Sequence, residues 1–268
     1  MYKLLFLILT FLSTISVFSQ DTLKLKLVWE KSLKSNLIGC IDEQQNAILF
    51  DGSEILKLNP QGDLLFHQSI KSLGIIKEID ARNPFKVLLF SENQQSINFV
   101  DNSLTLQNEA IDLSAFDVNN VISTSGSDQM DKCWVYNQDN SILKLIGKNK
   151  QQFQSISNLK KLVNLNSIDK IKEVNSILFL LDFSGKIVLL DIYGNLKSQF
   201  DFNPFTSAIM DQSMIYLQTD QTLLVFNYIK NQVVGYIKTP SNATIIGKKG
   251  DFFFFTEKNK ISKFIFCN

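Results

Sequence analysis

Short apolar runs alternate with polar turns along most of this chain. The runs are five to eight residues long, and the turns between them contain Asn, Asp, Gly, Ser or Gln. Apolar positions at helical spacing are almost absent. Many short runs of this kind are typical of β-strands joined by tight turns. The pattern therefore predicts an all-β fold.

One hairpin pattern, a strand followed by a polar turn and a second strand, recurs six times. Each turn contains an acidic residue, and these are Asp51, Glu92, Asp139, Asp182, Asp220 and Glu257. Successive acids are separated by 41, 47, 43, 38 and 37 positions. A repeat length of about 40 residues is typical of propeller blades. The sequence predicts a six-bladed β-propeller in which each blade is a four-stranded antiparallel sheet.

The sixth repeat is one strand short, because its third strand ends at Phe266. A segment near the N-terminus, 27–33, resembles the outer strand at 65–70 and precedes the first complete repeat. An N-terminal strand that completed the last blade would close the ring and pair two exposed sheet edges. We therefore expect Trp29 to lie in the outermost strand of that blade, and residues 20–268 to form a single domain.

The repeats resemble those of the broad propeller superfamily with PQQ-type, NHL-type and BamB-type blades. The resemblance rests on the core of strand, Asp or Asn turn and strand, and on the turn Leu-Asn-Pro-Gln-Gly-Asp-Leu-Leu at 58–65. The Trp-Asp dipeptide of a WD blade, the Tyr-Trp-Thr-Asp motif and the paired glycines of a kelch blade are absent from the sequence. The resemblance implies the architecture and does not extend to a cofactor or an activity.

Residues 1–19 have the order of a cleavable signal peptide. Lys3 precedes an apolar run, and small and polar residues follow it. Val17 and Ser19 stand three and one positions before the expected cut, so Gln20 would become the mature N-terminus. A membrane anchor is the alternative, but the apolar run is shorter than the roughly 20 residues that span a bilayer. We expect an exported protein, periplasmic or extracellular, and the Lys-, Asn-, Ile- and Phe-rich composition resembles that of bacterial envelope proteins.

The charge balance and the cysteines indicate which partners and which covalent links to expect. Residues 1–19 hold one of the 27 basic residues and no acid, so 27 − 1 = 26 basic and 26 acidic residues remain. This balance gives no electrostatic reason to expect nucleic acid or an anionic membrane surface as a partner. Three widely spaced cysteines, Cys40, Cys133 and Cys267, do not form a disulfide framework. We expect buried free thiols, with a single disulfide of unassigned pairing as the alternative.

The six turn acids are the polar feature that repeats. Turns between the second and third strands of propeller blades lie together on the face that usually carries binding sites, so a ring of carboxylates there could hold a cation or a basic partner. Backbone geometry offers a plainer interpretation, because Asp, Asn and Gly favour hairpin turns. We predict no metal site and no cofactor. Three loop aromatics, Phe116, Phe183 and Phe205, would suggest a protein-binding patch if they are exposed together.

The sequence contains no recognisable catalytic pattern. His67, the sole histidine, lies among apolar neighbours in an expected outer strand, and no catalytic residue is predicted. We interpret the chain as an exported, non-enzymatic scaffold that binds a protein or an envelope component. The alternative is an envelope hydrolase or lyase, which a cluster of carboxylates around the channel would favour. The candidates for that cluster are Asp42, Asp80, Asp169 and Asp211. A quinone-dependent dehydrogenase is disfavoured, because the chain is short and offers no metal-binding cluster.

Overall fold

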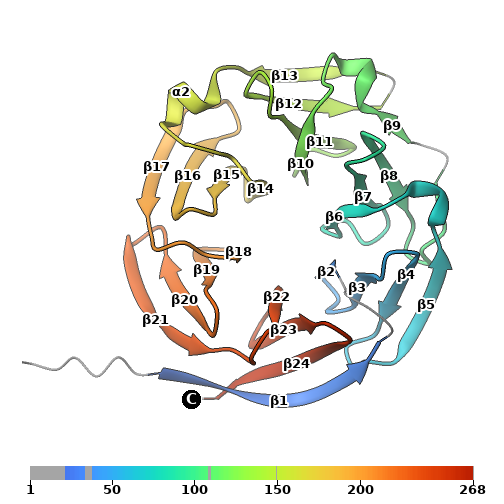
Figure 1. The fold of residues 1–268 in the computed structure, drawn as a ribbon, viewed down its shortest axis with the longest axis vertical. Coiled ribbons are helices and arrows are strands. Elements are labelled where there is room, and N and C mark those ends of the chain that lie inside the picture. The colour runs from blue at the N-terminus through green and yellow to red at the C-terminus, as the bar shows by residue number, and fades with distance from the viewer. Residues whose placement is uncertain (1–21, 34–37, 108–109, 149, 268) are drawn as a thin grey trace, which may run out of the picture.

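Six four-stranded blades surround a central channel (Figure 1). The computed structural model describes residues 22–33, 38–107, 110–148 and 150–267. The expected six-bladed β-propeller is confirmed over these residues. The expected signal peptide and the cut before Gln20 lie outside them. In the described part of the chain no helix is long and apolar enough to cross a membrane.

Each blade begins beside the channel, and its strands follow one another outward to the rim (Figure 1). Blade 1 consists of β2 (Ile38–Ile41), β3 (Ala47–Phe50), β4 (Glu54–Leu58) and β5 (Leu64–Ser69). Blade 2 consists of β6 (Ile76–Asp80), β7 (Val87–Ser91), β8 (Ser96–Val100) and the short β9 (Ile111–Asp112). Blade 3 consists of β10 (Val121–Gly126), β11 (Lys132–Asn137), β12 (Ile142–Gly147) and β13 (Gln152–Ile156).

The second half of the ring repeats this order. Blade 4 consists of β14 (Lys170–Val174), β15 (Ile177–Asp182), β16 (Lys186–Asp191) and β17 (Leu196–Asp201). Blade 5 consists of β18 (Ser207–Asp211), β19 (Met214–Gln218), β20 (Thr222–Asn227) and β21 (Gln232–Lys238). Blade 6 consists of β22 (Thr244–Lys249), β23 (Phe252–Glu257), β24 (Lys260–Cys267) and β1 (Thr22–Ser32). Three short helices, η2 (Lys71–Leu73), η3 (Leu113–Phe116) and α2 (Leu159–Val163), lie in connections between blades.

The antiparallel order of the strands gives the ring two different faces. Turns from the second to the third strand of each blade, and the connections to the next blade, lie on what we call the central-turn face. Turns from the first to the second strand and from the third to the fourth lie on the other side, which we call the outer-turn face. The six acids of the repeat are on the central-turn face, at the ends of β3, β7, β11, β15, β19 and β23.

The expected closure by an N-terminal strand is also confirmed. β1 runs antiparallel to β24 from the pair Lys24 and Cys267 to the pair Ser32 and Lys260. Trp29 lies opposite Lys263, within the segment expected from the sequence. The first residues of β1 also pair in parallel with β21 of blade 5, which joins blades 5 and 6 into one eight-stranded sheet.

The core consists of the second and third strands of the blades, which neighbouring blades cover on both sides. All four residues of β3 and five of the six residues of β15 are buried, and successive blades share apolar clusters. Burial on both faces explains why these strands are nearly continuous apolar runs rather than alternating ones. The outer strand β5, by contrast, is exposed at every position.

Candidate functional site

The six turn acids do not converge on one point of the central-turn face. Asp139 and Asp220 are exposed, Asp182 is buried, and the others are half-buried. Glu92 forms an ion pair with Lys77, and Glu257 lies 3.2 Å from the amine of Lys260. The Asp139 carboxylate accepts a hydrogen bond from Asn120 at 2.7 Å. Each of these contacts is a local one with a neighbouring strand or turn.

Two of these acids shape their own turns. Asp51 Oδ1 accepts hydrogen bonds from the backbone N–H groups of Ser53 and Glu54, at 3.0 and 2.8 Å. Asp182 Oδ1 accepts one from the N–H of Ser184 at 2.9 Å. Such side-chain acceptors replace the backbone partners that a tight turn leaves out. A binding role for the six acids stays a prediction, and the described contacts supply a structural role for at least these two.

The three loop aromatics are not exposed together. Phe116 and Phe205 are buried, at 6% and 4% exposure, and Phe183 is half-buried. Phe183 and Phe205 pack edge to face, with ring centroids 5.4 Å apart, in the cluster between blades 4 and 5. The condition under which they would suggest a protein-binding patch is therefore not met in the described structure, although their role in binding stays a prediction.

The residue types that most often bind metals or act as nucleophiles are dispersed. Among the described residues, no group of three or more His, Cys, Asp or Glu side chains could hold a metal ion. His67 lies in the exposed strand β5. Cys40, Cys133 and Cys267 are free thiols. Burial raises the pKa of the Cys40 and Cys133 thiols to about 12, which keeps both protonated at neutral pH.

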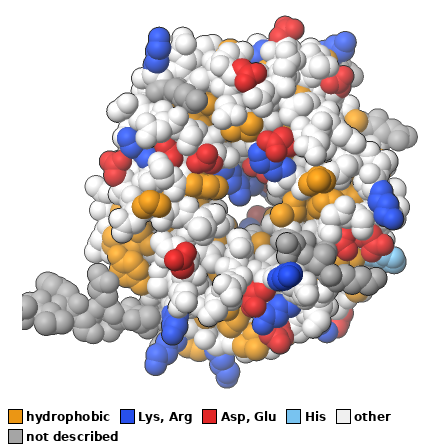
Figure 2. All heavy atoms as spheres, in the orientation of Figure 1, with side chains coloured by type: hydrophobic (Ala, Val, Ile, Leu, Met, Phe, Trp, Pro, Cys, Tyr) orange, Lys and Arg blue, Asp and Glu red, His pale blue; other side chains and the backbone are white. Residues whose placement is uncertain are grey.

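The central channel is a concave feature of the described structure, with a cavity of about 1100 Å³. Figure 2 shows its opening, with Lys or Arg and Asp or Glu side chains close by. The first strands of blades 1, 2, 4, 5 and 6 contribute most of its lining. Two of the four candidate carboxylates, Asp80 and Asp211, line this channel, whereas Asp42 and Asp169 do not.

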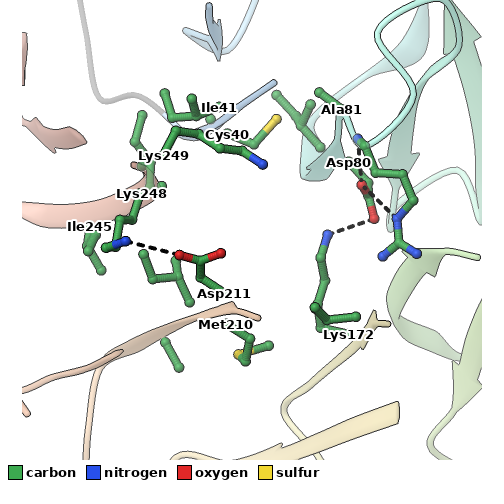
Figure 3. Close-up of a pocket in the computed structure, with 18 of the residues that line it drawn as sticks. Cys40, Ile41, Asp80, Ala81, Lys172, Met210, Asp211, Ile245, Lys248 and Lys249 are labelled. Atoms are coloured by element: carbon green, nitrogen blue, oxygen red, sulfur yellow. Dashed lines mark hydrogen bonds and ion pairs between the residues drawn. The ribbon is translucent and has the colours of Figure 1, made fainter. Parts of the chain in front are cut away.

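Asp80 is held by cations from two directions. Lys172 of blade 4 donates to Asp80 Oδ2 at 2.7 Å, and the Arg82 guanidinium lies 3.8 Å from Oδ1 (Figure 3). The N–H of Gly126 in blade 3 also donates to Oδ2 at 2.9 Å. Burial opposes ionisation of this carboxyl, but the charges of Lys172 and Arg82 outweigh it and hold its pKa far below the ordinary range. Asp80 thus joins blades 2, 3 and 4 at the channel wall.

The other channel carboxylates are engaged as well. Asp211 of blade 5 accepts from the amine of Lys248 of blade 6 at 3.0 Å (Figure 3). Glu78 accepts from the Ser123 hydroxyl at 2.7 Å and from the Thr124 N–H at 2.6 Å, although burial raises its pKa. These contacts cross from one blade to the next. The arrangement connects the inner strands of neighbouring blades.

Replacing Asp80 by Asn should destabilise the protein in a pH-dependent way. The amide cannot neutralise Lys172, so we expect a loss of about 2 kcal/mol in the free energy of unfolding at pH 7. Because the pKa of Asp80 is lowered on folding, its contribution is complete well above its ordinary value of 3.8 and declines as the pH falls through and below that value. Urea unfolding at pH 7, 4 and 3 should show the difference between Asp80→Asn and wild type shrinking with acid.

The matched control for this prediction is Asp63→Asn. Asp63 forms an exposed pair with Lys31 at 3.7 Å, so its loss should cost under about 0.5 kcal/mol at each pH. A difference between Asp80→Asn and wild type that stayed constant from pH 7 to pH 3 would contradict the role given to Asp80.

Comparison with solved structures places this geometry among known propellers. The WD40 domain of Neurospora crassa Pan2 matches 88% of this chain and 90% of its own, with a TM-score of 0.60 and 10% identity. Chaetomium thermophilum Raptor matches 87% of this chain and 24% of its own, with a TM-score of 0.58 and 13% identity. The likeness shows the fold. A third propeller, BBS1N in complex with ARL6DN, matches 86% of this chain and 77% of its own, with a TM-score of 0.53 and 10% identity.

The neighbours are thus of the WD40 type, and the finer resemblance to PQQ-type, NHL-type and BamB-type blades stays a prediction. No family model matches the sequence. No curated protein matches it either. At these identities the likeness extends only to the fold.

Several residues at the channel and on the exposed loops could not be identified as functional candidates from the sequence. Arg82 lies in the loop after β6, and Lys172 lies in β14 of another blade. Sequence spacing could not show that both contact Asp80. The four most exposed large apolar side chains among the described residues lie in turns of the outer-turn face, and they are Met130, Tyr193, Ile229 and Phe85. Met130, between Gln129 and Asp131, offers a hint, because it is an apolar residue in a polar loop.

Proposed function

We propose that this protein is an exported, non-enzymatic propeller that serves as a platform for binding another protein. One observation favours this proposal over the enzyme alternative: the channel carboxylates form ion pairs that join neighbouring blades. Asp80 and Asp211 are each held by a lysine, and they join neighbouring blades. Asp42 and Asp169 hold turns, the latter through the N–H of Phe183 at 2.7 Å. A ring tied together in this way presents its loops on a rigid frame.

The WD40-type likeness supports the same proposal. One similar propeller, BBS1N, was solved in complex with ARL6DN. Propellers place many loops on two faces of a stable ring, which suits recognition of a folded or extended protein surface. The partner of the present chain would be a protein or another component of the envelope, if the export signal acts as its sequence suggests.

The interaction role can be tested by crosslinking. The exported protein, carrying an affinity tag at its C-terminus, would be crosslinked in intact cells, purified and analysed by mass spectrometry. We expect one protein to be crosslinked in a fixed ratio through loops of one face. Hydrolysis or cleavage of an envelope polymer by the purified protein, abolished by Asp211→Asn, would contradict the proposal and favour the enzyme.

Export is tested separately by the mature N-terminus. Cleavage after Ser19 would leave β1 intact, since that strand begins at Thr22. Mass spectrometry of the protein recovered from its native compartment should therefore give a chain that begins at Gln20, with or without cyclisation of the glutamine. A chain that retains Met1, or that is found only inside the cytoplasm, would refute the export half of the proposal.

A further inference from the structure

Four large apolar side chains are exposed on the outer-turn face of blades 2 and 3. Met130 is 87% exposed, Phe85 66%, Phe153 47% and Leu106 40%. They come from the loop before β7, the loop before β9, the loop before β11 and the start of β13. We call these four residues the loop patch. Their combined exposed area is on the order of 400 Å², which is the size at which an apolar patch on a monomer is often functional.

The loops that carry the patch contact one another, so the four side chains belong to one surface. Gln107, next to Leu106, donates to the carbonyl oxygen of Phe85 at 3.2 Å. The two loops that hold Phe85 and Met130 are joined by Lys86 and Asp131, whose charged atoms lie 2.6 Å apart. This pair bridges blades 2 and 3.

The same surface reaches blade 3's outer strand. The amine of Lys132 lies 3.7 Å from the centre of the Phe153 ring, and its other contact is with Gln129 at 2.7 Å. A cation over the ring face favours this orientation of the aromatic side chain. The Phe85 N–H is likewise held, since it donates to the Asn83 side chain at 3.0 Å. A patch whose loops are already ordered loses less conformational entropy when a partner binds.

The charge around the patch differs from that of the chain as a whole. The described residues of segments 82–86, 101–107, 127–132 and 147–153 include five basic and three acidic side chains. They are Arg82, Lys86, Lys132, Lys148 and Lys150 against Asp101, Asp128 and Asp131. Arg82 and Asp128 line the channel and pair with each other at 2.7 Å, so four lysines remain against Asp101 and Asp131. Asp101 is directed to its own turn, where it accepts from two backbone N–H groups at 2.8 Å. The surface is therefore net positive, whereas the chain without its first 19 residues is formally neutral.

We propose that the loop patch binds an acidic segment of a partner protein that also presents apolar side chains. This inference rests on the proposed interaction function and specifies its surface and the chemistry of its partner. Met and aromatic residues are enriched in the centres of protein interfaces, and a flexible Met adapts its shape to the partner. Acidic residues of the partner would meet the surplus of lysines, which would also accelerate association. The binding surface is then on the outer-turn face, opposite to the repeated acids.

The test begins with a random peptide library displayed on phage and selected on the mature, folded protein. We expect the selected peptides to combine Asp or Glu with Phe, Leu, Met or Trp. Synthetic copies would be titrated by calorimetry against wild type, Met130→Asp and Phe85→Asp. Each substitution removes apolar contact and adds a charge like that of the peptide, so the dissociation constant should rise roughly tenfold or more.

Ile75→Asp is the matched control, because Ile75 is 62% exposed but lies between η2 and β6 on the central-turn face. It should leave the dissociation constant unchanged, and all three variants should unfold at the wild-type temperature. Selected peptides that bind Met130→Asp and Phe85→Asp as tightly as wild type would overturn the loop patch and leave the interaction function intact. Selection of no peptide, together with no crosslinked protein, would overturn both.

A lipid surface is the competing occupant of a basic and apolar patch. Sedimentation with vesicles of phosphatidylglycerol and phosphatidylcholine measures it directly. We expect the wild-type protein to stay in the supernatant. Sedimentation of wild type but not of Met130→Asp would overturn the protein partner and assign the patch to an anionic membrane.

Discussion

Removal of β1 should lower the midpoint of thermal unfolding by roughly 10–20 °C, which corresponds to about 5 kcal/mol for a chain of this length. The strand supplies the outer partner of β24 along its whole length and the only described partner of the outer edge of β21. Trp29 adds a contact with a third blade, because its indole N–H donates to the carbonyl oxygen of Pro60 at 2.9 Å. Without β1, two sheet edges are exposed and the junctions of blade 6 with both neighbours are weakened.

Differential scanning calorimetry of residues 20–268 with and without residues 22–32 measures this effect. Val28→Thr is the control within the same strand, since Val28 is 47% exposed and stands at the bulge between the paired residues Leu27 and Trp29. That substitution should shift the midpoint by no more than about 2 °C. If the midpoint of the shortened chain lay within a few degrees of that of the full chain, β1 would contribute little to the stability of the ring, which would contradict its role in closure.

Replacement of Lys57 by Met should be the most harmful of the charge substitutions, at about 3 kcal/mol. The Lys57 and Asp42 side chains are 2% and 0% exposed, and their charged atoms lie 3.5 Å apart. Lys57 also donates to the side chain of Asn102 in blade 2 at 2.5 Å. Met keeps an unbranched side chain of similar volume, but it leaves a buried carboxylate without its counter-ion and an amide oxygen without its donor.

Chemical denaturation at pH 7 measures the loss, and Lys31→Met is the same substitution at an exposed pair. Lys31 and Asp63 are 44% and 66% exposed, so that variant should lose under about 0.5 kcal/mol. Combining Lys57→Met with Asp42→Asn should cost less than the sum of the two single substitutions, because the second removes the charge that the first leaves unpaired. If Lys57→Met and Lys31→Met lowered the free energy of unfolding equally, the buried pair would contribute no more to stability than the exposed one.

The architecture could be predicted because a propeller repeats one local pattern. Each blade needs apolar second and third strands and a polar turn between them, so the six turns report the blade number directly. The missing strand followed from the same repeat, because the third strand of the last blade ends at Phe266 while 27–33 has no place in the first blade. The strand bounds given by the sequence agree closely with the structure: the outer strand expected at 65–70 is β5 (Leu64–Ser69), and the segment 27–33 falls at the end of β1 (Thr22–Ser32).

The candidate surfaces were harder to predict, because they depend on residues that only the closed ring brings together. Lys172 and Asp80 are 92 positions apart and meet across the first strand of blade 3. Lys57 lies in an apolar strand, where a lysine gives no sign that it is buried beside Asp42. Phe116 and Phe205 were candidates because they lie in loops, but the neighbouring blades cover both side chains. Periodicity identifies blades, and it does not indicate which loop residues face solvent.

The pairing of the two ends of the chain also sets the order in which the ring can be completed. Glu30 contacts Lys260, 230 positions later. During synthesis, β1 can therefore form its pairing only after β24 has been made. Pairing between such distant segments costs loop-closure entropy before it returns any stabilisation, and it makes folding slow. A chain that emerges N-terminus first would present β1 as an unpaired edge until blade 6 is made. Until then, this unpaired edge is open to pairing with a neighbouring chain.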